Sequence, residues 1–159
     1  MPRFKDYIPH GVIPATLAAF DADFEFDWAE TRRHLAFAAD IDGVTAITVN
    51  GHASEVHACT FDEQTRVMAE ASDEIGDRMP LIAGVYADGS HEAVRLAKMS
   101  EANGASALLC FPPNSMGMGG IRDEWHVEYF EPRITGDLGK DQSCVWGDGG
   151  GESFRITRV

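Results

Sequence analysis

The feature that most constrains the fold of this chain is a regular alternation of short apolar runs and amphipathic stretches. Four runs rich in β-branched and apolar residues predict strands that are buried on both faces, and the stretches between them predict helices. Strands that alternate with helices in this way form a parallel sheet with right-handed crossovers. The predicted strands are 11–20, 44–49, 80–86 and 106–111. Repeating βα units suit a barrel, and a doubly wound sheet remains an open alternative.

Capping patterns locate the start of each predicted helix. Asp27 is followed three residues later by Glu30, and Thr60 by Glu63, which is the pattern of a capping box. Ser90 is predicted to cap the third helix, which should end at residues 103–104, an Asn-Gly pair. The alternation therefore predicts three helices between the four strands.

The pattern stops after about residue 115. From Met116 onward we find no amphipathic helix and no buried strand, although residues 154–157 can form a short edge strand. We therefore divide the chain into residues 1–120, a βα domain, and residues 121–159, an irregular tail. A structureless stretch of this length is unusual in a compact domain. Our hypothesis is that the tail is unrelated to the domain, for example through a frameshift or a mis-called gene end.

The balance of charge excludes several classes of partner. The chain has 13 Lys and Arg against 26 Asp and Glu, a formal net charge of −13. Nucleic acids and anionic membranes attract positive charge, so neither is expected as a partner. No apolar run approaches the ~20 residues of a membrane span, and the first six residues lack the apolar core of a signal peptide, so we expect neither segment. The three cysteines are widely spaced, which indicates reduced thiols in a cytoplasmic protein.

Polar residues follow the second predicted strand abruptly. Asn50, Gly51, His52, Ser54 and Glu55 come directly after the apolar run that ends at residue 49. In barrels and open sheets alike, ligands bind at the carboxyl ends of the strands. This turn is therefore the predicted ligand site.

The same region supports a second interpretation, a metal-dependent aldolase or hydrolase. His52, Glu55 and His57 are closely spaced, and imidazole and carboxylate groups bind divalent metals. No separated third or fourth ligand stands out in the rest of the chain. The acidic stretch 21–25 is interpreted as a solvated turn, because no calcium-loop pattern follows it.

Four segments stand out within the first 115 residues or so: 11–20, 50–55, 80–85 and 104–113. In their order and spacing they resemble the dihydrodipicolinate synthase / N-acetylneuraminate lyase family. This resemblance implies an α/β fold, a partial (β/α)8 TIM barrel of about four βα units with an irregular C-terminal tail. It implies a lyase or aldolase that acts on a 2-oxo acid such as pyruvate through a Schiff base, without a cofactor. It also implies that the full-length family member is a homo-oligomer.

The resemblance implies substrate-binding residues as well. The family has a Gly-Thr-Thr-Gly-Glu turn that holds the carboxylate of the 2-oxo acid. By position, Gly51, His52, Ala53 and Ser54 correspond to this turn, and Ala15 in the first strand is counted with them. Both family threonines are replaced here, and the family tyrosines after the fourth strand are not seen. The chain therefore looks like a divergent branch of the family.

Lysine marks the main departure from the family, whose chemistry needs a lysine amine at a buried strand end. The chain has Lys5, Lys98 and Lys140, and none of them is on an apolar strand. We expect the Schiff-base reaction to be incomplete in this chain, so no catalytic residue is assigned. A third interpretation is a catalytically inactive, oligomerising fragment, whose fourth strand would leave an unpaired edge.

Overall fold

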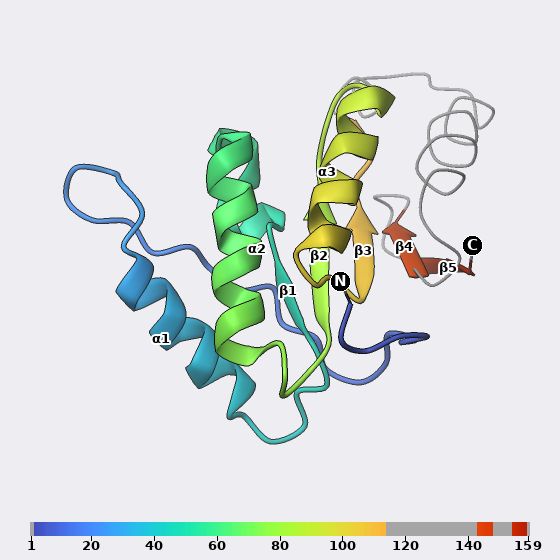
Figure 1. Ribbon diagram of the computed structural model, residues 1–159, viewed down its shortest axis with the longest axis horizontal. Helices are drawn as coiled ribbons and strands as arrows, with labels where there is room; N and C mark the ends of the chain where they lie inside the picture. Colours follow the sequence, from blue (N-terminus) through green and yellow to red (C-terminus); the bar gives the residue numbers. More distant parts are fainter. Residues whose placement is uncertain (1, 114–142, 148–153, 159) are drawn as a thin grey trace.

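The computed structural model describes residues 2–113, 143–147 and 154–158, and within these residues it contains one five-stranded sheet (Figure 1). The strands lie in the order β1-β2-β3-β4-β5; the first four run parallel, and β5 is antiparallel to β4. The elements are α1 (Trp28–Ala39), β1 (Ile47–Val49), α2 (Phe61–Ile75), β2 (Leu81–Val85), α3 (Ser90–Ala102), β3 (Ala107–Cys110), β4 (Ser143–Gly147) and β5 (Phe154–Arg158). Two short 3-10 turns, η1 (His52–Ser54) and η2 (Val56–Ala58), follow β1.

Strands β1, β2 and β3 alternate with α2 and α3, as the sequence predicts. Each crossover moves one position in the same direction across the sheet. Right-handed crossovers in one direction place their helices on one face, and Figure 1 shows the helices on the same side of the sheet. The carboxyl ends of the three strands therefore meet at one edge.

Side chains alternate between the two faces of each strand. The helix face carries the larger core, in which Ile47 and Val49 of β1 pack with Leu81 of β2 and Leu108 of β3. The opposite face carries a small cluster of Ala46, Ile82 and Ala107, against which residues of the N-terminal segment pack. A fully buried aliphatic side chain contributes about 1.5–3 kcal/mol, so the helix face stabilises the fold most.

Local hydrogen bonds explain where the helices start. The Asp27 carboxylate accepts from the Glu30 amide at 2.9 Å, but the Glu30 side chain pairs with Arg33, so only half of that capping box forms. The box of Thr60 and Glu63 is complete. Ser90 was expected to cap α3, and this prediction is wrong. Gly89 is the N-cap, with extended backbone and no side-chain cap bond, and Ser90 is the first helical residue.

The first predicted strand, residues 11–20, is an extended segment and not a buried strand. It touches the sheet through two single parallel bridges, Val12 to Val44 and Ala15 to Thr48. Val12 is 62% exposed and Leu17 is 59% exposed. Its other side pairs with no strand among the described residues, so these apolar side chains lack the cover that would bury them.

The C-terminal segments differ in part from expectation. The short edge strand expected at 154–157 is confirmed as β5. Strand β4 was not predicted; it pairs with β3 in parallel and covers the edge that we expected to be unpaired. Residues 114–142 and 148–153 lie outside the described residues, so the proposed division at residue 120 stays a prediction. Over the part of the chain that is described, none of the helices has the length and apolar character needed to cross a membrane.

Candidate substrate site at the carboxyl ends of the strands

The turn after β1 is tied to the start of α2. Asn50 is buried and has a left-handed backbone, with φ of 53°, and its side-chain amide donates to the Gln64 carbonyl at 3.0 Å. Asparagine tolerates this conformation better than most residues. The chain therefore reverses at Asn50 and enters η1 at His52, with Gly51 as its N-cap.

Ser54 stabilises η1 through two hydrogen bonds to the Gly51 carbonyl. Its hydroxyl donates to the Gly51 carbonyl at 2.9 Å, and its amide donates to the same carbonyl at 3.1 Å. Ser54 is buried, whereas His52 and Ala53 are exposed. The first amides of a helical turn have no acceptor within that turn, so those of His52 and Ala53 are suited to an anion.

Gly84 in β2 makes room for this turn. A Cβ built on Gly84 would lie 1.9 Å from the Asn50 carbonyl oxygen and 3.0 Å from the Gly51 Cα. Only glycine permits such close approach of two backbones. The turn is therefore pressed against the end of β2. Ala15 is close to the turn as well, because a Cβ on Gly51 would be 3.9 Å from the Ala15 Cβ.

Three rings from three strand ends gather beside the turn. The His52 ring stacks on Phe111, with centroids 3.9 Å apart, and meets Tyr86 edge-on at 5.2 Å. Tyr86 directly follows β2 and Phe111 directly follows β3. Neither residue stands out in the sequence as a site residue, although each is the first residue after a buried strand. Their position at three adjacent strand ends is the signal that could have found them.

The electrostatic environment keeps the His52 imidazole neutral. Partial burial, and then the nearby His57, lower the pKa of His52 from its ordinary value. A neutral imidazole has one N–H donor and one acceptor nitrogen. The ring can therefore donate one hydrogen bond to a ligand while it stacks on Phe111.

The structure does not support the metal interpretation of His52, Glu55 and His57. Among the described residues, no three His, Cys, Asp or Glu side chains gather as a metal site. Glu55 has a left-handed backbone between η1 and η2, and it separates the two histidines into different turns. The expected cation site is thus not assembled.

Neither Cys59 nor Cys110 is an activated nucleophile. Burial, Glu63 and Glu55 raise the pKa of the Cys59 thiol to about 11, so the thiol stays protonated at neutral pH. Cys110 is buried in the core of the helix face, as expected for a small apolar residue. We therefore count neither of these two thiols in the site.

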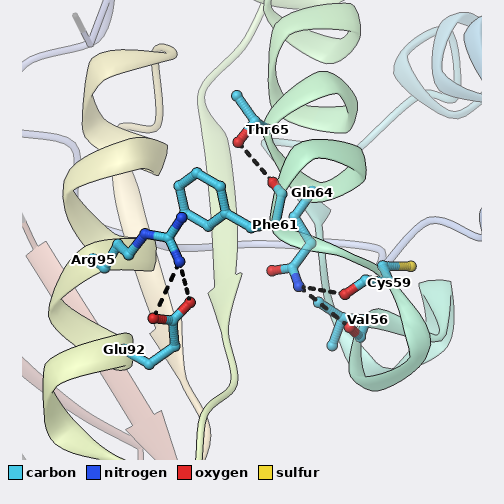
Figure 2. Close-up of polar contacts among 7 residues, drawn as sticks. All are labelled: Val56, Cys59, Phe61, Gln64, Thr65, Glu92 and Arg95. Carbon is cyan, nitrogen blue, oxygen red and sulfur yellow. Dashed lines mark hydrogen bonds and ion pairs between the residues drawn. The ribbon is translucent and has the colours of Figure 1, made fainter.

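Gln64 fixes the end of the turn region to α2. Figure 2 shows its side-chain amide donating to the carbonyls of Val56, at 3.4 Å, and Cys59, at 3.0 Å. The same view shows Arg95 of α3, which pairs with Glu92 and stacks over the Phe61 ring at 3.6 Å. These contacts tie η2 to α2 and α2 to α3.

Comparison with known proteins identifies the family of this chain. Residues 8–118 match the model of the dihydrodipicolinate synthetase family. The chain belongs to this family. It is 36% identical over 112 residues to a protein of Pseudarthrobacter chlorophenolicus described as a probable 5-dehydro-4-deoxyglucarate dehydratase. It is 34% identical over 108 residues to 4-hydroxy-tetrahydrodipicolinate synthase of Salinibacter ruber.

These matches cover 70% and 68% of this chain but only 36% and 35% of the two relatives. The chain thus spans about a third of the length of the curated relatives it matches. Solved structures of the dihydrodipicolinate synthetase family share the fold. Dihydrodipicolinate synthase of Bacillus anthracis superposes with a TM-score of 0.76 at 23% identity, over 88% of this chain and 46% of its own. N-acetylneuraminate lyase of Mycoplasma synoviae gives 0.74 at 20%, over 86% and 45%.

Proposed function

We propose that this chain forms part of a (β/α)8 barrel and carries the carboxylate-binding turn of a lyase or aldolase for a 2-oxo acid such as pyruvate. Gly51, His52, Ala53 and Ser54 hold the carboxylate, and Ala15 lies beside them. Family membership supports the reaction class, since the two matched relatives are named as a probable dehydratase and a synthase. In the complete enzyme we expect the site to belong to a homo-oligomer.

One observation carries the proposal. Turn η1 follows the carboxyl end of β1, and its first two residues, His52 and Ala53, are exposed. Backbone N–H groups that lead a turn form a concave anion site without needing a particular side chain. The cradle can therefore survive the replacement of both family threonines.

His52 distinguishes this site from one with a threonine hydroxyl. Its ring is held between Phe111 and Tyr86 and is neutral near pH 7. An imidazole ring takes up more of the space beside the turn than a threonine hydroxyl does, and its N–H donor lies farther from the backbone of the turn. We expect this difference to change which 2-oxo acid fits, while carboxylate binding itself is kept.

The chemical step needs an amine that the described residues do not place at the site. In a Schiff-base lyase, the lysine nitrogen attacks the C2 carbonyl carbon, water leaves, and an imine forms. Lys5 is exposed before the first extended segment, and Lys98 is exposed on α3. Lys140 lies outside the described residues. The chain is therefore proposed to bind the 2-oxo acid without forming the imine itself.

The test of binding is an NMR titration of the 15N-labelled chain with pyruvate, with methyl pyruvate as the uncharged control. We expect amide shifts at residues 51–54 with pyruvate and none with the ester. Ala53→Pro removes one leading N–H and should abolish the shifts, whereas Ala58→Gly in the next turn should not. Equal shifts with the ester would show that the turn does not recognise a carboxylate.

Borohydride trapping tests the incomplete reaction separately. The chain is incubated with pyruvate, reduced, and weighed intact by mass spectrometry. We expect no adduct. A single adduct mapped to Lys140 would show that the residues after 113 supply the amine, and would refute the proposal that imine formation is missing.

A second candidate is an inactive, self-associating fragment. The exposed apolar side chains Val12 and Leu17 on the outer extended segment favour it. Light scattering across a concentration series should then show oligomers, and Leu17→Ser should reduce them. A monomer at high concentration would remove this candidate.

A further inference from the structure

A cavity of about 500 Å³ lies outside the proposed substrate turn, between the loop 20–26 and the residues around η2 and the start of α2. None of Gly51 to Ser54 lines it. Six of its lining side chains fall into two chemical kinds, aromatic rings and carboxylates. The rings are Phe20, Phe24 and Phe26, and the carboxylates are Asp21, Glu55 and Glu63.

The rings continue an aromatic row that already holds one cation. Phe20 packs on Phe26 with centroids 4.7 Å apart, and Phe26 stacks on Trp28 at 4.5 Å. At the Trp28 end, the guanidinium of Arg66 lies 4.0 Å over the indole ring. Aromatic faces attract cations through their negative quadrupole. The row therefore accepts an organic cation at one end, and the cavity lies at its other end.

The cavity is electronegative. Asp21 is held in place because its carboxylate accepts from the amides of Asp23, at 2.9 Å, and Glu25, at 3.0 Å. Hydrogen bonds from Thr60 lower the pKa of Glu63, which is therefore ionised at neutral pH. The lining includes no lysine or arginine. Arg66 lines an adjoining hollow that shares Phe26 and Glu63 with this cavity, and its guanidinium pairs with Glu70 of the same helix.

Phe24, at the rim of the cavity, has an uncommon backbone conformation and an exposed ring. Its backbone is left-handed, with φ of 65°, and its side chain is 87% exposed. Both features cost free energy for a large aromatic residue in the unliganded chain. A ligand that covers this ring would recover part of that cost.

We propose that this cavity is a binding site for a small organic cation, a guanidinium or amidinium group on an apolar body. The apolar body packs on Phe20 and Phe26 while Phe24 covers it from the rim. The charged group faces Glu55, Glu63 and Asp21. The site is separate from the 2-oxo acid turn and does not depend on that assignment.

The probe is benzamidine, a flat aromatic cation, and the control ligand is benzamide, its uncharged counterpart. Each is titrated into the 15N-labelled full chain and followed by amide shifts. We expect benzamidine to shift the amides of Phe24, Glu55 and Cys59 and benzamide to leave them unchanged. The affinity should fall as salt is raised, because the contact is between exposed charges.

Three variants separate the contributions. Glu55→Gln and Phe24→Leu should each weaken benzamidine binding about two- to fivefold, the size expected for one exposed charge pair or one cation–π contact. Asp42→Asn makes the same change of charge in the exposed turn before β1 and should leave binding unchanged.

Three results would overturn the proposal. Equal binding of benzamide would show a hollow that is merely apolar. An equal loss of benzamidine affinity in Glu55→Gln and Asp42→Asn would show an effect of net charge only. Absence of shifts at the cavity amides would show that no such site exists. Because pyruvate is titrated separately, none of these results bears on the 2-oxo acid turn.

Discussion

Replacing Gly84 by alanine should both destabilise the fold and displace the proposed carboxylate turn. A Cβ on Gly84 would be 1.9 Å from the Asn50 carbonyl oxygen, whereas ordinary contact begins at 3.4 Å. The two backbones must therefore separate by about 3.4 − 1.9 = 1.5 Å along this contact. The obstructing atoms belong to the main chain of the turn, so no side-chain rotation can relieve the clash.

The expected cost follows from this geometry. Overpacking a well-packed interior costs about 1–3 kcal/mol, and a main-chain obstruction belongs at the upper end of that range. The gain from reduced freedom of the unfolded chain, about 0.4–1 kcal/mol, offsets part of the cost. We expect Gly84→Ala to lower the free energy of unfolding by about 2–3 kcal/mol.

Urea unfolding followed by far-UV circular dichroism measures this cost. Gly89→Ala is the matched control, because a Cβ there meets nothing within 4 Å and the backbone φ is −117°. We expect the control to stay within about 1 kcal/mol of the parent chain. The NMR titration should show weaker pyruvate shifts in Gly84→Ala only. Parent-like stability and parent-like pyruvate shifts in Gly84→Ala would refute the claim that β2 presses on the turn.

Three further predictions concern the frame of the site. Glu70→Gln removes a carboxylate that is 10% exposed and pairs with two arginines, so we expect a loss of about 1–2 kcal/mol in urea unfolding at pH 7. Burial alone would raise the pKa of Glu70, but the two arginines outweigh burial and lower that pKa. The loss of unfolding free energy relative to the parent should therefore shrink as the pH falls below about 4.3, the pKa of Glu in the unfolded chain. Thr60→Ala removes one half of a capping box, and thermal unfolding should show a cost of about 1 kcal/mol, unlike Thr60→Ser. His57→Ala removes a neighbouring imidazole and should raise the pKa of His52 in an NMR titration; an unchanged pKa would mean that burial alone sets it.

Local patterns in the sequence predicted much of the frame. Short apolar runs marked the strands β1, β2 and β3, and the Thr60–Glu63 spacing marked the start of α2. Both signals lie within a few neighbouring residues of the chain. The N-cap of α3 was misplaced by one residue, because Gly89 and Ser90 both suit that position by propensity. Strand β4 was missed because its place in the sheet comes from pairing with β3, which lies more than thirty residues earlier.

The candidate site was predicted only in part, for a similar reason. Gly51 to Ser54 could be selected because they follow a buried run and resemble a family turn. The contacts of His52 with Tyr86 and Phe111 join residues 34 and 59 positions apart in the chain, and no short pattern reports them. Likewise, the role of Gly84 depends on the path of the turn after β1.

The sequence by itself determined the order of the elements from β1 to β3, the acidic charge and the place of the turn, because each shows in composition or in neighbours along the chain. Only the tertiary structure decided how that turn is used. In the folded chain the Ser54 hydroxyl donates to the Gly51 carbonyl, and the His52 ring stacks on Phe111. Among the described residues, His52, Glu55 and His57 do not form a metal site. The tertiary structure also assembles the aromatic and acidic cavity from a loop and a helix start about forty residues apart. These properties depend on distances across parallel strands, which packing sets and a linear pattern does not record.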